Sequence, residues 1–132
     1  MRQTNINRNN SVFVLISFEG PDIYSQAGGL GVRVTNLAHS LAEQGFPTQL
    51  FFIGDPGKAG EEKSEDRLTL HRWCQWISEY HPVGVYQGEY EKLRDFNDSL
   101  PAFIVNKVVK PAIARQKFVV VLGEEWHTTE VM

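Results

Sequence analysis

Short apolar runs alternate with mixed polar segments along this chain, and four of the apolar runs have the length of a β-strand. They are rich in β-branched and aromatic side chains and cover residues 11–18, 48–54, 67–73 and 117–123. The first, second and fourth runs are continuously apolar, which is typical of strands covered on both faces in a parallel sheet. The third run alternates between apolar and polar positions, which predicts an edge strand with one face in water.

The clearest helix lies between the first two strands, in the stretch SQAGGLGVRVTNLAHSLAEQGF. Its apolar residues recur at the spacing of one helix face: Leu30, Val34, Leu37, Ala38, Leu41 and Ala42. Gly45 is expected to end this helix, and Pro47 prevents its continuation. A strand, a helix and a second strand with this spacing predict a right-handed βαβ unit.

The second half of the chain has a helical pattern over about residues 99–115, with Ser99 as a capping residue and Pro101 in the first turn. Pro111 is expected to end or kink that helix. A shorter helix is expected over residues 89–96. Together these elements predict an α/β fold, Rossmann-like and three-layered, with a mostly parallel sheet of order 3-2-1-4 and helices on both faces.

Length and charge limit the class of protein. With 132 residues, 42% of them hydrophobic, the chain is expected to form one domain over residues 1–132. A formal net charge of -3 with scattered basic residues argues against nucleic acid or an anionic membrane as a partner. The acidic run EEKSED, residues 61–66, is predicted to be a solvated loop.

The single cysteine, Cys74, excludes an internal disulfide and suits a reducing compartment, and its neighbours predict a packing role. The N-terminal residues are polar, and the first apolar run is too short for a signal peptide or a membrane span. A cytoplasmic location is therefore expected. The spacing of the histidine, cysteine and carboxylate residues predicts no metal site.

Ligands of doubly wound sheets bind beyond the carboxyl ends of the strands, where the strand order reverses. Here that point lies between the first and fourth predicted strands, so residues 19–31 and 124–130 are expected to face one crevice. Gly28, Gly29 and Gly31 permit two interpretations: a tight turn with close helix packing, or amides at a helix N-terminus that accept an anion such as phosphate. A Walker A loop is excluded, because no Lys-Ser or Lys-Thr follows the glycines.

A dinucleotide-binding fingerprint is a rival interpretation of the same glycines. Gly29-Leu30-Gly31 would begin it, and Asp55 at the end of the second strand would bind a ribose. Two features count against it: Val34 occupies the third glycine position, and about ten residues separate the first strand from the glycines. A long loop of this kind suits a larger ligand lying across the sheet edge.

Two longer stretches resemble a known family. FEGPDIYSQAGGLGVRVTNLAHSLAEQGFPTQLFFIGD, followed after the fourth strand by GEEWHTTEVM, is similar to the N-terminal domain of GT-B glycosyltransferases of the glycogen/starch synthase and sucrose synthase superfamily, family 4-like. The shared features are a Gly-Gly loop opening the first helix, an L-A-x-x-L-A-x-x-G pattern along it, and an acidic-Trp-His-Thr segment. The resemblance covers essentially the whole chain.

The resemblance implies a retaining glycosyltransferase that transfers a sugar from a nucleotide-sugar donor to an acceptor, which is expected to be a carbohydrate. The nucleotide-sugar is a substrate, so no cofactor is expected. The residues that the resemblance assigns are His127 for catalysis, Gln26, Gly28 and Gly29 for the donor phosphate or sugar, and Glu124 and Glu125 for acceptor or sugar binding.

This chain departs from the family pattern at several positions. Gln26 stands where the synthases have a phosphate-binding lysine, and Val32 stands where an aspartate follows the GGLG sequence. Glu124 replaces the first histidine of the HDWHT segment. These differences favour a broad retaining glycosyltransferase over a glycogen or starch synthase, and they leave the partner of the phosphate charge unassigned.

Enzymes of this family have two Rossmann-like domains, and the donor site lies mainly on the second. The resemblance therefore implies that this chain is part of the acceptor-side domain, that the donor domain is absent, and that the chain alone is inactive. Further strands follow the fourth strand in the family, so the strand edge between Phe118 and Leu122 is expected to be open and to self-associate. Two other functions stay open: an NAD(P)- or nucleotide-binding Rossmann domain, and a non-catalytic carbohydrate-binding module.

Overall fold

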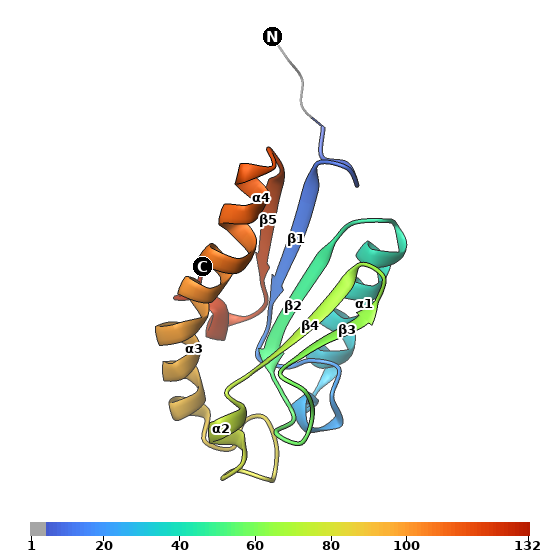
Figure 1. Cartoon of the computed structure of the whole chain (residues 1–132). Helices are drawn as coiled ribbons and strands as arrows, with labels where there is room; N and C mark the ends of the chain where they lie inside the picture. Colours follow the sequence, from blue (N-terminus) through green and yellow to red (C-terminus); the bar gives the residue numbers. More distant parts are fainter. Residues whose placement is uncertain (1–4) are drawn as a thin grey trace.

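The computed structural model describes residues 5–132, which form one mostly parallel sheet with helices on both of its faces (Figure 1). The strands are β1 (Ser11–Ile16), β2 (Thr48–Ile53), β3 (Glu61–Glu65), β4 (Leu68–Trp73) and β5 (Phe118–Gly123). The α-helices are α1 (Gly29–Glu43), α2 (Gln75–Ser78), α3 (Glu89–Ile104) and α4 (Lys110–Ala114). Two 3-10 turns, η1 (Ile23–Ser25) and η3 (Trp126–Thr128), and a π-helical segment, η2 (Val105–Val109), complete the set. The predicted α/β class with a mostly parallel sheet is confirmed.

The strand order is β3-β4-β2-β1-β5, in which β4, β2, β1 and β5 run parallel and β3 pairs antiparallel with β4. The predicted order 3-2-1-4 is therefore wrong, because the acidic segment predicted to be a loop adds a fifth strand at the edge. As a consequence β4 is an inner strand and not the edge strand that its alternating pattern predicts. A charged strand is tolerated at an edge, where both of its faces meet water, and the side chains of β3 are mostly exposed.

Side chains of β4 provide charge partners for the acidic β3. A carboxylate oxygen of Glu62 lies 2.8 Å from Nη2 of Arg72, and one of Glu61 lies 3.5 Å from Nδ1 of His71. Burial lowers the pKa of His71, although the neighbouring Glu61 opposes that effect. Backbone pairing and these contacts together explain why a segment with no apolar pattern lies on the sheet.

The apolar residues form two cores, one on each face of the sheet. Alternate residues of β1 point to opposite faces: Leu15 packs under α1, whereas Val14 and Ile16 pack under α3. The core under α1 consists mainly of Leu15, Val34, Ala38, Leu50, Phe52, Leu68 and Leu70. The core under α3 and η2 includes Val14, Ile16, Phe18, Phe51, Ile53, Phe96, Leu100 and Ile104.

The helix α1 ends at the residues that the sequence predicts. Gly45 adopts φ 95°, and its amide donates to the Ala42 carbonyl at 2.9 Å. The Phe46 amide then donates to the Leu41 carbonyl at 3.0 Å. Because this left-handed conformation suits glycine, Gly45 closes the helix as its terminating residue.

The helices α3 and α4 form one continuous helical run through η2, so the two separate helices predicted over residues 89–96 and 99–115 are not observed. Pro101 lies inside α3, and Pro111 lies in the first turn of α4. Proline cannot donate a backbone hydrogen bond, and its ring collides with the preceding turn of an α-helix. The disruption predicted at Pro111 therefore takes the form of a wider π-helical turn directly before it, and the helix does not end.

Candidate functional site

Two segments far apart in the sequence meet at the carboxyl ends of β1 and β5. The glycine loop, residues 19–31, leads from β1 to α1, and the post-β5 segment, residues 124–132, follows β5 (Figure 1). Nη2 of Arg33 on α1 lies 2.7 Å from a carboxylate oxygen of Glu124. The ring centroids of Phe18 and His127 lie 4.3 Å apart and are stacked. The residues that flank the glycine loop, Phe18 and Arg33, thus contact the post-β5 segment, near the point where the strand order reverses.

The glycine loop is tied to the sheet by an ion pair that is shielded from water. Nε and Nη2 of Arg72 on β4 donate to the two oxygens of Asp22 at 2.8 and 3.1 Å, and both side chains are 2% exposed. The Asp55 amide donates to the same carboxylate at 2.9 Å, and the Ser25 hydroxyl donates to the Ile53 carbonyl. These bonds place the loop across the carboxyl ends of β2 and β4.

A buried lysine anchors the same loop on the side of α3. The Lys92 ammonium donates to the Tyr24 hydroxyl at 2.8 Å and to the carbonyls of Val85 and Gly84 at 2.9 and 3.1 Å. Its side chain is completely buried, and this burial lowers the pKa of Lys92 to about 8. Because its three protons all have acceptors, the lysine joins η1, α3 and the segment between α2 and α3.

The amides of the glycine loop already bind an anion, the carboxylate of Glu19. Oε1 of Glu19 accepts from the amides of Ala27, Gly28 and Gly31 at 3.1, 3.2 and 3.2 Å. The Tyr86 hydroxyl donates to Oε2 at 2.6 Å. Burial raises the pKa of Glu19, but the hydrogen bonds from Tyr86 and from the three amides outweigh it, and the net shift is downward. Glu19 is therefore ionised at neutral pH and fills the position at the helix N-terminus that suits an anion.

The three glycines of the loop differ in what surrounds them. A Cβ atom on Gly31 would lie 2.8 Å from the carbonyl oxygen of Gly20, so this position requires glycine. Gly28 and Gly29 have open space where a Cβ would lie, and both are exposed. The neighbouring Gln26 is exposed, and its side-chain amide donates back to the Pro21 carbonyl at 2.9 Å. Close packing thus accounts for Gly31, whereas Gly28 and Gly29 border free space.

His127 is buried, so it is not an exposed histidine at the start of a helix. Its side chain is 4% exposed, and its ring stacks on Phe18 and on Trp126. Nε2 lies 2.6 Å from Oε1 of Glu89 in the first turn of α3. Because an ionised carboxylate only accepts hydrogen bonds, Nε2 must carry the proton of this contact. Nδ1 has no hydrogen-bond partner among residues 5–132, although Oε2 of Glu125 lies 3.5 Å away.

The crevice carries more negative than positive charge. Glu124 is paired with Arg33, whose side chain is 66% exposed, and Glu125 is exposed with φ 65°. Glu19 and Glu89 lie nearby, but Glu19 is buried and Glu89 contacts His127, so Glu124 and Glu125 supply the charge of this edge. Such a surface accepts hydrogen bonds from the hydroxyl groups of a sugar and repels a diphosphate.

Glu19, Tyr86 and Glu89 are the site residues that the sequence analysis misses. Glu19 does have a signal, since it is an acidic residue directly after a buried strand and therefore at the carboxyl edge of the sheet. Tyr86 and Glu89 have none, because they lie just before and at the start of α3, and only folding brings them to the glycine loop and to the post-β5 segment.

Asp55, the proposed ribose ligand of the dinucleotide interpretation, belongs to a turn. Its Oδ1 accepts from the Gly57 amide at 2.8 Å, and its own amide donates to Asp22. Its carboxylate therefore stabilises the turn after β2, and the anion position beside the glycines holds Glu19.

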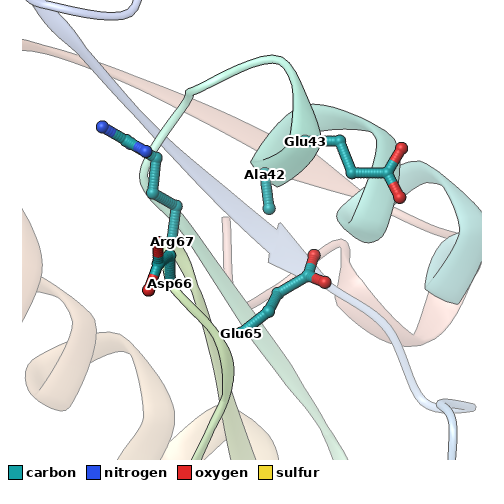
Figure 2. Close-up of a pocket in the computed structure, with 5 residues that line it drawn as sticks. All are labelled: Ala42, Glu43, Glu65, Asp66 and Arg67. Carbon is teal, nitrogen blue, oxygen red and sulfur yellow. The ribbon is translucent and has the colours of Figure 1, made fainter.

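A hollow of about 360 Å³ lies at the opposite end of the sheet, between the end of α1 and the β3–β4 turn. It is lined by Ala42, Glu43, Glu65, Asp66 and Arg67 (Figure 2). Figure 2 shows the Arg67 guanidinium pointing away from the carboxylates of Glu43 and Glu65. Oε1 of Glu65 instead lies 3.1 Å from Nδ1 of His39. This hollow is remote from the carboxyl ends of the strands, and none of its lining residues belongs to the crevice.

Residues 5–132 contain no group of three or more histidine, cysteine or carboxylate side chains that could hold a metal ion. None of the helices in that described range combines the length and apolar character needed to cross a bilayer. No protein-family model, no curated protein and no solved structure matches this chain.

Proposed function

We propose that this domain belongs to a retaining, nucleotide-sugar-dependent glycosyltransferase and binds the carbohydrate acceptor. The proposal rests on the order of the glycine loop, α1 and the Glu-Trp-His-Thr segment in the sequence. The contacts of Phe18 and Arg33, on either side of the glycine loop, with the post-β5 segment support it, because ligands of doubly wound sheets bind at this edge.

The single observation that favours a sugar over a dinucleotide is the position of Glu19. A pyrophosphate would need the amides of the glycine loop, and Glu19 accepts from three of them. The carboxylates of Glu124 and Glu125 offer acceptors for sugar hydroxyls. The amides of Gly29 and Leu30 have no acceptor among residues 5–132, so they remain as donors to a sugar oxygen.

His127 is the proposed catalytic residue of this site. Glu89 holds its Nε2 proton, so Nδ1 is the ring atom left to accept a hydrogen bond from a sugar hydroxyl. Nδ1 is buried beside Glu125, so Glu125 would have to move to admit the sugar. Stacking on Phe18 and Trp126 fixes the plane of the ring. In retaining transfer the departing diphosphate also needs cationic donors. The resemblance assigns these donors to a second domain, so residues 1–132 alone are expected to bind sugar without transferring it.

Isothermal titration calorimetry tests this function against its rivals. We expect the chain to bind an oligosaccharide, and to bind NAD(H) and UDP- or ADP-sugars far more weakly. Micromolar NAD(H) binding with no binding of sugars or sugar nucleotides would establish the dinucleotide-binding alternative. Oligosaccharide binding that survives substitution of both His127 and Glu124 would favour a non-catalytic carbohydrate-binding module elsewhere on the surface.

Gly29→Val tests the open space beside the loop. Gly29 begins α1 with a helical backbone and has free space around its Cβ position, so the variant is expected to fold normally. Its branched side chain would occupy the space proposed for the sugar, and we expect binding to weaken by about tenfold or more. Asn36→Val, an exposed site further along α1, is the matched control. Unchanged sugar binding in folded Gly29→Val would show that the loop is only a turn.

A further inference from the structure

His127 lies between two carboxylates, one at each ring nitrogen. Nε2 is 2.6 Å from Oε1 of Glu89, and Nδ1 is 3.5 Å from Oε2 of Glu125; among residues 5–132, neither carboxylate has another ion-pair partner. A neutral imidazole with its proton on Nε2 presents a lone pair at Nδ1, and an ionised carboxylate has no proton to donate to it. An imidazolium has an N–H group at both nitrogens, so each carboxylate then has a donor. The contact at Nδ1 is therefore attractive when His127 is protonated and repulsive when it is neutral.

The other groups around the imidazole keep one charge state near neutral pH. The rings stacked on it, those of Phe18 and Trp126, are uncharged. The ring of Tyr86 lies 5.8 Å away, and burial together with Glu19 raises the pKa of Tyr86, so its hydroxyl stays protonated. The lowered pKa of Glu19 keeps that carboxylate ionised. A histidine side chain ordinarily gains or loses its proton between about pH 5 and 8, so a change of charge in this cluster falls on His127.

The backbone of Glu125 is strained. Its φ of 65° and ψ of 176° fall in a region that is essentially restricted to glycine. Glu124 before it is fixed by the hydrogen bond from its amide to the Ile16 carbonyl, at 2.9 Å, and by the ion pair of its side chain with Arg33. On the other side, the Thr128 hydroxyl donates to the Glu125 carbonyl at 3.0 Å. Glu125 is thus a strained joint between β5 and η3, and releasing its side chain allows the backbone to relax.

We propose that Glu125 is a gate over Nδ1 of His127, closed when the imidazole is protonated and open when it is neutral. In the closed state the carboxylate lies beside Nδ1, as in the structure, where this atom is buried. Loss of the proton replaces an attraction by a repulsion, so Glu125 moves outward and its backbone strain is released. Nδ1 is then free to accept from a sugar hydroxyl, a role that rests on the proposed function. Sugar binding is therefore coupled to the release of a proton, and acidification closes the site.

NMR of the full chain without a ligand tests the gate itself. The ring nitrogens of His127, assigned by the loss of their signals in His127→Gln, report its protonation. The Cα and Cβ shifts of residue 125, which depend on φ and ψ, report the gate, and we expect them to change together with the ring nitrogens. In Glu125→Gln the charge is absent, so the backbone at this position should no longer follow the imidazole. Glu130→Gln, an exposed site in the same segment, is the matched control and should keep the coupled change. Backbone shifts of Glu125 that stay constant while His127 titrates would overturn the proposal, whether or not the chain binds sugar.

Calorimetry with maltohexaose, a neutral glucose oligomer, tests the coupling to sugar. Titrations in buffers of different ionisation enthalpy measure the proton released on binding, and the affinity should fall by about tenfold or more between about pH 8 and pH 5. Glu125→Gln should reduce both the proton release and the pH dependence, whereas Glu130→Gln should leave both unchanged. Maltohexaose binding without proton release would overturn the coupling of the gate to sugar. A coupled change in the NMR spectra with no maltohexaose binding would instead count against the proposed function and leave the gate standing.

Discussion

The glycine loop and the post-β5 segment lie at the same, carboxyl edge of the sheet, but they are held in different ways. The glycine loop is fixed by polar contacts shielded from water, above all the Asp22–Arg72 ion pair and the amides that donate to Glu19. The post-β5 segment is fixed by the stacked ring of His127, its contact with Glu89, and the ion pair of Glu124 with the exposed Arg33.

This difference has a consequence for binding. Breaking a buried ion pair leaves a charge without a partner in the protein interior, which is strongly unfavourable. The glycine loop therefore has one well-defined conformation. Exposed ion pairs are weak and are readily exchanged for contacts with a ligand. We infer that the glycine loop is preformed, and we expect Glu124 and Glu125 to be the part of this edge that adjusts to a ligand.

Asp22→Ala should lower the stability of the protein more than any other variant that tests this difference. It leaves the buried Arg72 guanidinium with only Glu62 as a charge partner, and we expect a loss of about 3–5 kcal/mol in the free energy of unfolding. Urea denaturation followed by circular dichroism measures it. Asp98→Ala is the matched control, because its pair with Arg94 is exposed and should contribute under about 1 kcal/mol. Similar losses for both variants would mean that the loop is not anchored by the buried pair.

Gly31→Ala should have the next largest effect. Its Cβ would lie 2.8 Å from the carbonyl oxygen of Gly20, so the helix must shift from the loop, at a cost of about 1–3 kcal/mol. Gly29→Ala, two residues earlier in the same turn, has free space and should be neutral or slightly stabilising, because alanine favours a helix. Thermal unfolding of Gly31→Ala and Gly29→Ala compares the two positions directly. Equal melting temperatures for the two variants would contradict the close approach of α1 to the loop.

Glu19→Gln should lower stability by about 1–2 kcal/mol at neutral pH, because a neutral amide is a weaker acceptor for the loop amides and for Tyr86. The pH dependence has a defined sign. Since the pKa of Glu19 in the folded protein lies below its ordinary value of 4.5, the carboxylate stabilises the fold above pH 4.5. That stabilisation is lost as pH falls through the lowered pKa. Unfolding free energies of wild type and variant should therefore converge on acidification. A constant difference across the range would show that Glu19 does not titrate with a lowered pKa.

Arg33→Ala should have the smallest effect, a loss of about 0–1 kcal/mol, because its pair with Glu124 is largely open to water. High salt should reduce the difference further. Denaturant titration at low and high salt measures both quantities. A loss as large as that of Asp22→Ala would show that the two segments are held equally firmly.

The strands β1, β2 and β5 and the helix α1 could be predicted from the sequence, because the residue patterns that specify them lie within each element. Continuously apolar runs predict β1, β2 and β5, and the 3.6-residue spacing between Leu30 and Ala42 predicts α1. Gly45 marks the end of α1, since its φ of 95° suits glycine. The edge at which the loops after β1 and β5 lie also follows from sequence, because the two strands are parallel neighbours.

Three features depended on tertiary structure, because their causes are contacts between distant segments. The acidic β3 pairs with β4 through backbone bonds that leave no trace in its residue pattern. Tyr86, 67 positions away in the sequence, helps hold Glu19 at the loop amides by donating to its second oxygen. His127 is buried because Phe18 and Glu89 come from two other segments of the chain. Periodicity records which side of a helix or strand meets the core, whereas the partner of a polar group is chosen only when the chain has folded.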